Sequence, residues 1–235
     1  MPVPTDALPP FPGFRAEAFQ FLRDLKAHNE REWFKPRKAT YEDELLWPAR
    51  CLIAQVSEEA PHHGLPLRGT PKKSVFRIYR DTRFSKNKAP YKTHVGLVLT
   101  RTGAKDDPGG LYVHIEPDNC FLAAGFWAPE SPFLRRWRER IVANPDGFLQ
   151  TVEQVEEAGL TLSARDSLKR MPRGFEDFAD HPAADYLKWK GTIANQPVAD
   201  AEAMTPAFTE TVLTFAAAAQ PLLDFGWTLT DEVAA

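Results

Sequence analysis

The sequence predicts an α+β fold, in which a central antiparallel sheet is flanked by N-terminal and C-terminal helices. Apolar side chains recur at helical spacing before about residue 60 and after about residue 130, and at alternate positions in between. The composition, 43% hydrophobic and 26% charged over 235 residues, is that of an ordinary folded chain. No run of about 18 apolar residues is present, so no membrane span is predicted.

Two helical segments are predicted before the sheet. The first runs from Phe14 to His28, where apolar side chains recur at helical spacing. The second follows Asn29 and Glu32, which have the spacing of a capping box. Pro48 is expected to kink or split the helix that can start at Pro36 and carries an apolar stripe from Tyr41 to Val56, because proline removes a backbone donor and crowds the preceding turn.

Four strands are predicted in the middle of the chain, at 74–80, 93–101, 111–116 and 120–127. The connections between the last three are short and rich in turn-forming residues, so an antiparallel meander is expected. In the third strand Tyr112, His114 and Glu116 alternate with apolar residues and therefore share one face.

Helices are predicted again after the sheet, from Ser131 to about Val142, from Pro145 to near Gly159 and from about Ala201 to Leu223, with a further strand within 186–195. No shift of composition marks a boundary, so one domain is expected over residues 1–235. Five prolines within the first 12 residues predict an extended lead-in over 1–13, and residues from about 230 to 235 are expected to fray.

A cytoplasmic location is predicted from the cysteines and the first residues. Cys51 and Cys120 are two widely spaced cysteines, which is the pattern of neither a disulfide framework nor a zinc site. The chain also starts without the basic and apolar regions of a secretory signal.

A strongly basic segment stands out from an acidic chain. The whole chain has 29 basic and 32 acidic residues, a net charge of −3. Residues 68–94 hold nine basic residues and one acid, so this segment carries +8 and the remainder −11. Such a local concentration of positive charge attracts anions.

The candidate ligand-binding residues come from this basic segment, because the planar guanidinium suits paired hydrogen bonds to phosphate or carboxylate. They are Arg77, Arg80, Asp81, Arg83, Lys88, Tyr91, Lys92 and His94. The three arginines would hold the anion, the aspartate would orient them, and Lys88 with Tyr91 would close the site.

His114 and Glu116 are the candidate catalytic residues, since a histidine beside a carboxylate can act as an oriented base. His94, on the neighbouring strand, is expected to lie near them. The alternative interpretation is a structural, hydrogen-bonded cross-strand pair. A metal site formed by His94, His114 and Glu116 has no recognised ligand spacing, so no metal is predicted.

Three functions remain open at this point. The first is binding of a small phosphorylated or otherwise anionic ligand, with acid–base chemistry if the protein is an enzyme. The second is a nucleic-acid-binding module, in which Tyr79, Phe84 and Tyr91 would stack on bases. The third is a structural or partner-binding protein whose arginines are paired with its own acids. The sequence holds no nucleotide-binding, zinc-protease or nucleophile-elbow motif, so it identifies no reaction, cofactor or oligomeric state.

The string RIYRDTRFSKNKAPYKTH, from Arg77 to His94, resembles the signature of domain of unknown function family 2461. The signature R-x-x-R-D-x-R-F-x-x-x-K-x-x-Y falls on Arg77, Arg80, Asp81, Arg83, Phe84, Lys88 and Tyr91. The strings NEREWF (29–34), YVHIEP (112–117) and LKRMPRGF (168–175) resemble the family as well. The resemblance implies a single domain of about this length and implies no particular activity.

Overall fold

The computed structural model describes residues 8–234 of the chain. Residues 1–7 of the predicted lead-in and Ala235 of the predicted frayed tail lie outside these residues. Residues 8–13 are non-helical as expected, whereas residues 230–234 belong to a helix and are not frayed. The chain divides into two compact units. The first unit contains 1–105, 112–122 and 197–214, and the second unit contains 106–111, 123–196 and 215–235.

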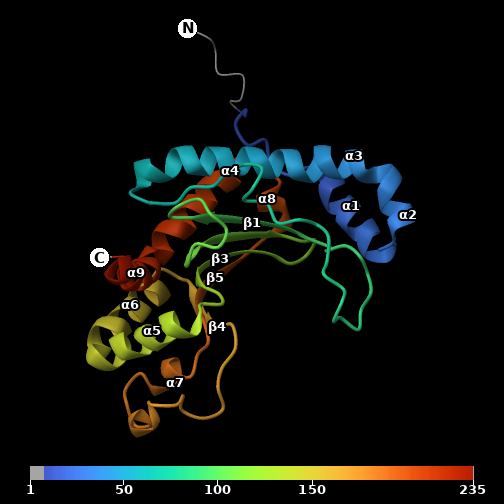
Figure 1. Cartoon of the computed structure of the whole chain (residues 1–235). Coiled ribbons are helices and arrows are strands. Elements are labelled where there is room, and N and C mark those ends of the chain that lie inside the picture. Colours follow the sequence, from blue (N-terminus) through green and yellow to red (C-terminus); the bar gives the residue numbers. More distant parts are fainter. Residues whose placement is uncertain (1–7, 235) are drawn as a thin grey trace. The chain divides into compact units, whose positions relative to one another are not determined.

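The sheet has five strands, in the order β1 (Val95–Thr100), β2 (Gly110–Ile115), β3 (Cys120–Phe126), β5 (Thr192–Val198) and β4 (Thr161–Ala164). The predicted α+β class and the antiparallel meander are confirmed, because β1, β2 and β3 are consecutive in the chain and adjacent in the sheet (Figure 1). β4 pairs antiparallel with β5, with Thr161 opposite Asn195. The short strand β4 was not predicted, and β5 begins later than the strand expected within 186–195.

The prediction of a strand at 74–80 is wrong. Val75 and Tyr79 form only isolated bridges, to Leu97 and Tyr91 respectively. The segment follows the edge of β1 for a few residues, where the Phe76 amide donates to the Gly96 carbonyl at 2.9 Å. It then leaves β1 and pairs with residues 90–92, which return toward β1. Each of these two pairings is too short to form a regular strand.

The helices before the sheet are α1 (Ala16–Ala27), α2 (Arg31–Phe34), α3 (Lys38–Tyr41) and α4 (Trp47–Glu59). Short 3₁₀ helices lie at 35–37 and 60–63, and a π-helical turn lies at 42–46. Pro48 occupies the first turn of α4, directly after the π-helical turn at 42–46. The backbone stays helical between them, because Leu46 has helical angles and the Trp47 amide donates to the Glu42 carbonyl. α4 packs against β1 (Figure 1), and its Leu52, Ile53 and Val56 are fully buried.

The helices after the meander are α5 (Ser131–Ala143), α6 (Pro145–Glu157), α7 (Ala184–Leu187), α8 (Asp200–Ala203) and α9 (Phe208–Ala234). α9 continues beyond its predicted end near Leu223. Within the second unit, the ring of Trp137 packs on Phe225 of α9 at a centroid distance of 4.9 Å, and Phe126 of β3 stacks on Phe133 of α5 at 5.1 Å. Over residues 8–234, no helix has both the length and the apolar character needed to cross a membrane.

Asn29 does not cap a helix, in contrast to the capping-box prediction. α2 begins after Glu30 and receives no side-chain cap. The Asn29 side chain instead pairs with the backbone of Tyr91, where its Nδ2 donates to the carbonyl and its Oδ1 accepts from the amide, both at 3.0 Å. This contact fixes the returning arm of the basic segment to the helical part of the first unit.

Replacing Asn29 with alanine is therefore expected to destabilise the protein by about 1–3 kcal/mol, because two part-buried backbone groups of Tyr91 lose their partners. Urea unfolding of Asn29→Ala measures this loss. Asn87→Ala is the control, since the exposed Asn87 side chain accepts a bond only from a nearby amide of its own loop. Equal stability of the two variants would show that the Asn29 contact is not a structural anchor.

Candidate functional site

The basic segment forms a projecting loop next to β1. Its two arms are joined by backbone hydrogen bonds from Arg80 to Pro90 at 2.9 Å and from Lys92 to Ile78 at 2.7 Å. Figure 1 shows this loop as the teal-green excursion beyond the end of β1. Six of the eight predicted ligand-binding residues lie at the tip of this loop or at its base.

At the tip, one arginine is paired with a carboxylate. The guanidinium of Arg83 binds Asp81 in a two-pronged contact, with Nη2 to Oδ2 at 2.7 Å and Nε to Oδ1 at 3.0 Å. This contact lowers the pKa of Asp81 and raises that of Arg83, and both side chains are exposed. Arg80 and Lys88 donate to backbone carbonyls of the same loop, at 3.2 and 2.9 Å, so these contacts leave their charges uncompensated.

At the base, the ammonium groups of Lys92 and Lys105 lie over the ring of Phe76, and the positive charge of Arg77 acts on both lysines; we call Arg77, Lys92 and Lys105 the basal cluster. The Nζ atoms of Lys92 and Lys105 lie 5.4 and 4.8 Å from the ring centroid. Burial lowers the pKa of both lysines, and the positive charge of Arg77 lowers it further. Among the described residues, no carboxylate lies within ion-pair distance of any member of the basal cluster.

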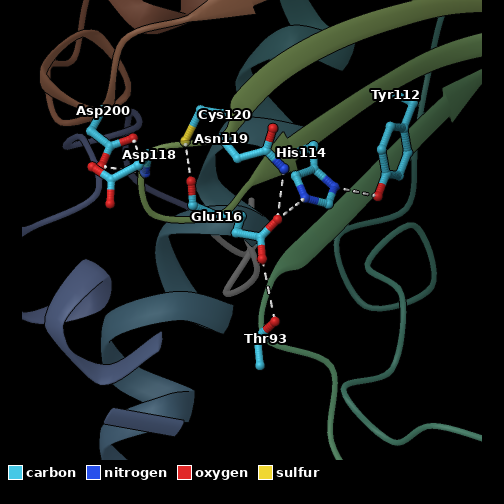
Figure 2. Close-up of polar contacts among 8 residues, drawn as sticks. All are labelled: Thr93, Tyr112, His114, Glu116, Asp118, Asn119, Cys120 and Asp200. Carbon is cyan, nitrogen blue, oxygen red and sulfur yellow. Dashed lines mark hydrogen bonds and ion pairs between the residues drawn. The ribbon is translucent and has the colours of Figure 1, made fainter. Parts of the chain in front are cut away.

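A row of hydrogen-bonded side chains lies on one face of β2, centred on His114 (Figure 2). Nδ1 of His114 is 3.0 Å from the hydroxyl of Tyr112, and Nε2 is 3.3 Å from Oε2 of Glu116. Glu116 also accepts from Nδ2 of Asn119 at 2.7 Å and from the hydroxyl of Thr93 at 3.3 Å. Tyr112, His114 and Glu116 lie side by side because they are alternate residues along β2 and the position that directly follows it.

The two histidines of the site are held in their neutral form. The rings of His94 and His114 are 4.3 Å apart, and His114 also stacks on Phe121 at 4.5 Å. Burial lowers the pKa of His94 to about 4 and lowers the pKa of His114, although Glu116 opposes the second shift.

The neutral state assigns the protons of the row. Hydrogen bonds from Asn119 and His114 lower the pKa of Glu116 although burial opposes them, so its carboxylate is ionised and can only accept. Nε2 of His114 must then carry the proton, and Nδ1 accepts from the Tyr112 hydroxyl. Both ring nitrogens of His114 are therefore occupied within the protein.

A cavity of about 380 Å³ lies beside Glu116, between α1 and the turn from β2 to β3. It is lined by Leu22, Arg23, Lys26, Ala27, Thr93, Glu116, Pro117 and Asp118. Arg23 lies 3.5 Å from a carboxylate oxygen of Asp118 and 3.4 Å from one of Asp200. In the described part of the chain, no group of three His, Cys, Asp or Glu side chains is placed to hold a metal ion.

The predicted residues thus fall into three groups. Arg80, Asp81, Arg83 and Lys88 are at the loop tip, Arg77 and Lys92 are in the basal cluster, and His94, His114 and Glu116 are in or against the row. Tyr91 joins none of them, because its buried ring stacks on Phe34 at a centroid distance of 4.2 Å.

Comparison with protein families shows where the chain belongs. The model of a family described as conserved hypothetical protein (DUF2461) matches residues 17–225, which is most of the chain. The chain is a member of the DUF2461 family. The resemblance of the loop sequence to this family is thereby confirmed. Searches of curated proteins and of solved structures return no match.

Sequence reasoning missed several residues of the site in this DUF2461 member. Lys105 comes from the connection after β1 and reaches the basal cluster because segment 74–76 runs along the edge of that strand. Tyr112 was placed on the right face but was not recognised as a partner of His114. Its phenol lies across β1 where Gly96 has no side chain, since a Cβ there would be 2.6 Å from the hydroxyl. A glycine at position 96, opposite Tyr112 on the neighbouring strand, is the sequence signal that could have indicated where the Tyr112 ring lies.

Proposed function

We propose that the protein binds a small ligand carrying a phosphate or carboxylate group, and that the basal cluster holds this group. The proposal depends on one observation: Arg77, Lys92 and Lys105 lie together, two of them partly buried, without a carboxylate partner among the described residues. Like charges gathered in this way raise the free energy of the unliganded protein, and a bound anion would relieve that repulsion.

The surroundings of the basal cluster suit a ligand with a body as well as a charge. The ring of Phe76 is in contact with the ammonium groups of both lysines and meets the ring of Tyr112 edge to face at 6.0 Å. The aromatic surface would contact the uncharged part of the ligand, while Arg80 and Lys88 add to the positive potential of the approach.

Binding, rather than catalysis by His114, is the function that this geometry supports best. His114 would have to give up one of its two hydrogen bonds before it could exchange a proton with a ligand. In the proposal, His114 and Glu116 orient the phenol of Tyr112 beside the basal cluster.

The test is calorimetric titration at low salt with inorganic phosphate, nucleotides, sugar phosphates and polyphosphate. Arg77→Gln and Lys105→Gln should each weaken binding about tenfold, since a charge-assisted hydrogen bond contributes about 1.5–3 kcal/mol. Lys72→Gln, which removes an exposed charge from the same segment, is the control and should change affinity less than twofold. A flat titration across the panel, or equal weakening by all three variants, would overturn the proposal.

A nucleic-acid-binding function is the second candidate, and the exposure of two aromatic rings on the loop supports it. Phe84 is 95% exposed and Tyr79 is 57% exposed, so both could stack on bases, whereas Tyr91 is buried. Oligonucleotide binding that falls steeply with salt, and whose affinity is markedly reduced in Phe84→Ala, would favour this function over the first. The third candidate, a structural protein whose arginines all pair with its own acids, fits Arg83 within the described loop. It does not fit Arg77 or Arg80, which have no carboxylate partner there.

A further inference from the structure

We infer that the cavity between α1 and the β2–β3 turn binds a small zwitterion, whose ammonium group pairs with Glu116 and whose anionic group pairs with Lys26. This site is distinct from the basal cluster and does not depend on the function proposed above.

The cavity has the size and lining of a site for a small metabolite. Its volume of about 380 Å³ falls at the lower end of the range for ligand pockets, roughly 300–1,000 Å³. Leu22, Ala27 and Pro117 supply apolar surface, while charged side chains lie on both walls. A molecule of amino-acid size fits such a space, whereas a polymer would not.

On one wall, Glu116 presents a negative charge that lacks a cationic partner. Its side chain is only 18% exposed, and its hydrogen bonds come from neutral donors: a hydroxyl, an amide and the neutral imidazole of His114. Figure 2 shows the carboxylate between Thr93 on one side and the pair of Asn119 and His114 on the other. The bond to Thr93 is long, at 3.3 Å, so Oε1 retains capacity for a further donor. A part-buried carboxylate in this state favours a cation from outside.

On the other wall, the two cations of α1 differ. Arg23 is balanced by Asp118 and Asp200, and the Asp200 carboxylate is itself fixed by the amide of Asp118, at 3.0 and 3.1 Å. Lys26, almost one turn further along α1, is exposed and has no carboxylate within ion-pair distance among the described residues.

The uncompensated charges of the cavity are therefore one anion and one cation on opposite walls. A ligand with a single charge would be stabilised at one end and would leave the other end uncompensated. A ligand with an ammonium and a carboxylate or phosphate, joined by a short linker, is stabilised at both ends. Its chemical class is that of an amino acid or a phosphorylated amine.

The experiment is a ligand-observed NMR titration of the full chain. The probes are glycine, β-alanine, 4-aminobutyrate and phosphoethanolamine, compared with butylamine and butyrate, which carry one charge each. At least one zwitterion should bind about tenfold more tightly than both singly charged probes. A preference for phosphoethanolamine over the amino acids would identify phosphate as the anionic group.

Two variants test the two ends of the cavity. Glu116→Gln keeps the shape of the side chain and should abolish binding of the zwitterion and of butylamine. Lys26→Gln, at an exposed position where folding is not at risk, should reduce zwitterion affinity to that of butylamine and leave butylamine unchanged. Lys35→Gln, an exposed lysine outside the cavity, is the control and should bind like the wild type.

Three outcomes would overturn the inference. The first is that no probe binds the wild type. The second is that Lys26→Gln binds the zwitterion as tightly as Lys35→Gln does. The third is that Lys26 and Glu116 pair directly in solution, in which case Lys26→Gln would increase butylamine binding. Arg77→Gln should bind the zwitterion normally, so a failure of the anion site would leave this result unaffected.

Discussion

Replacing Gly125 with alanine is expected to destabilise the protein by about 3 kcal/mol or more. Gly125 lies in β3 with a φ of +141°, a backbone conformation that costs an L-residue about 1–3 kcal/mol. An added Cβ would also lie 2.2 Å from the carbonyl oxygen of Thr192 in the adjacent strand β5. Backbone atoms on both sides cannot yield unless the two strands separate, so strain and overlap act together.

Thermal unfolding measures this effect. For a chain of this size, a loss of about 3 kcal/mol lowers Tm by roughly 6–12 °C. Gly64→Ala is a matched control, because Gly64 also has a positive φ, of +70°, but an added Cβ would meet nothing within 4 Å. It should cost only about 1 kcal/mol. If both variants unfolded at the same temperature, the close approach of β3 and β5 at Gly125 would be refuted.

Acidification from about pH 6.5 to pH 4 is expected to destabilise the protein by roughly 2 kcal/mol. His94 has a pKa of about 4 in the folded protein, below its ordinary 6.5. Between these values the unfolded chain binds a proton that the folded protein does not, so the free energy of unfolding falls as the pH falls. The difference corresponds to at most about 3 kcal/mol, and contact of the ring with solvent reduces this to roughly 2 kcal/mol.

The neighbours of His94 act in the same direction. Burial also lowers the pKa of His114, which adds to the loss below about pH 6.5. The pKa of Glu116 is lowered as well, so its contribution is present above its ordinary value of 4.5 and is lost only below it. The steepest loss is therefore expected above pH 4, in the range where histidines titrate.

Urea unfolding at several pH values tests this prediction. His94→Gln cannot be protonated and should lose less stability than the wild type between pH 6.5 and 4. His63→Gln removes an exposed histidine and should follow the wild-type pH dependence. Parallel curves for all three proteins would exclude His94 as the source of acid sensitivity.

Local patterns were sufficient to predict the meander and the shared face of β2. The alternation in 111–116 depends only on neighbouring residues, so it placed Tyr112, His114 and Glu116 together without any knowledge of the rest of the chain. The basic loop was also recognisable, because its charge is concentrated in one continuous segment.

Long-range pairing was what the sequence did not reveal. Asn29 has the local pattern of a helix cap, but its side chain is used by Tyr91, 62 positions away. Segment 74–80 alternates like a strand, yet β1 offers it a partner over only a few residues. Lys105 reaches the basal cluster from outside the basic segment, so no count of local charge could include it.

The interleaving of the two units has a consequence for how the chain is made. The first unit needs residues 197–214: Phe208 packs near Phe11 with ring centroids 6.3 Å apart, and the Phe14 amide donates to the Ala203 carbonyl at 3.1 Å. A ribosome delivers this stretch only after most of the polypeptide has emerged. The nascent N-terminal part therefore keeps apolar surface uncovered until late in translation, which is the period in which chaperones act on incomplete domains.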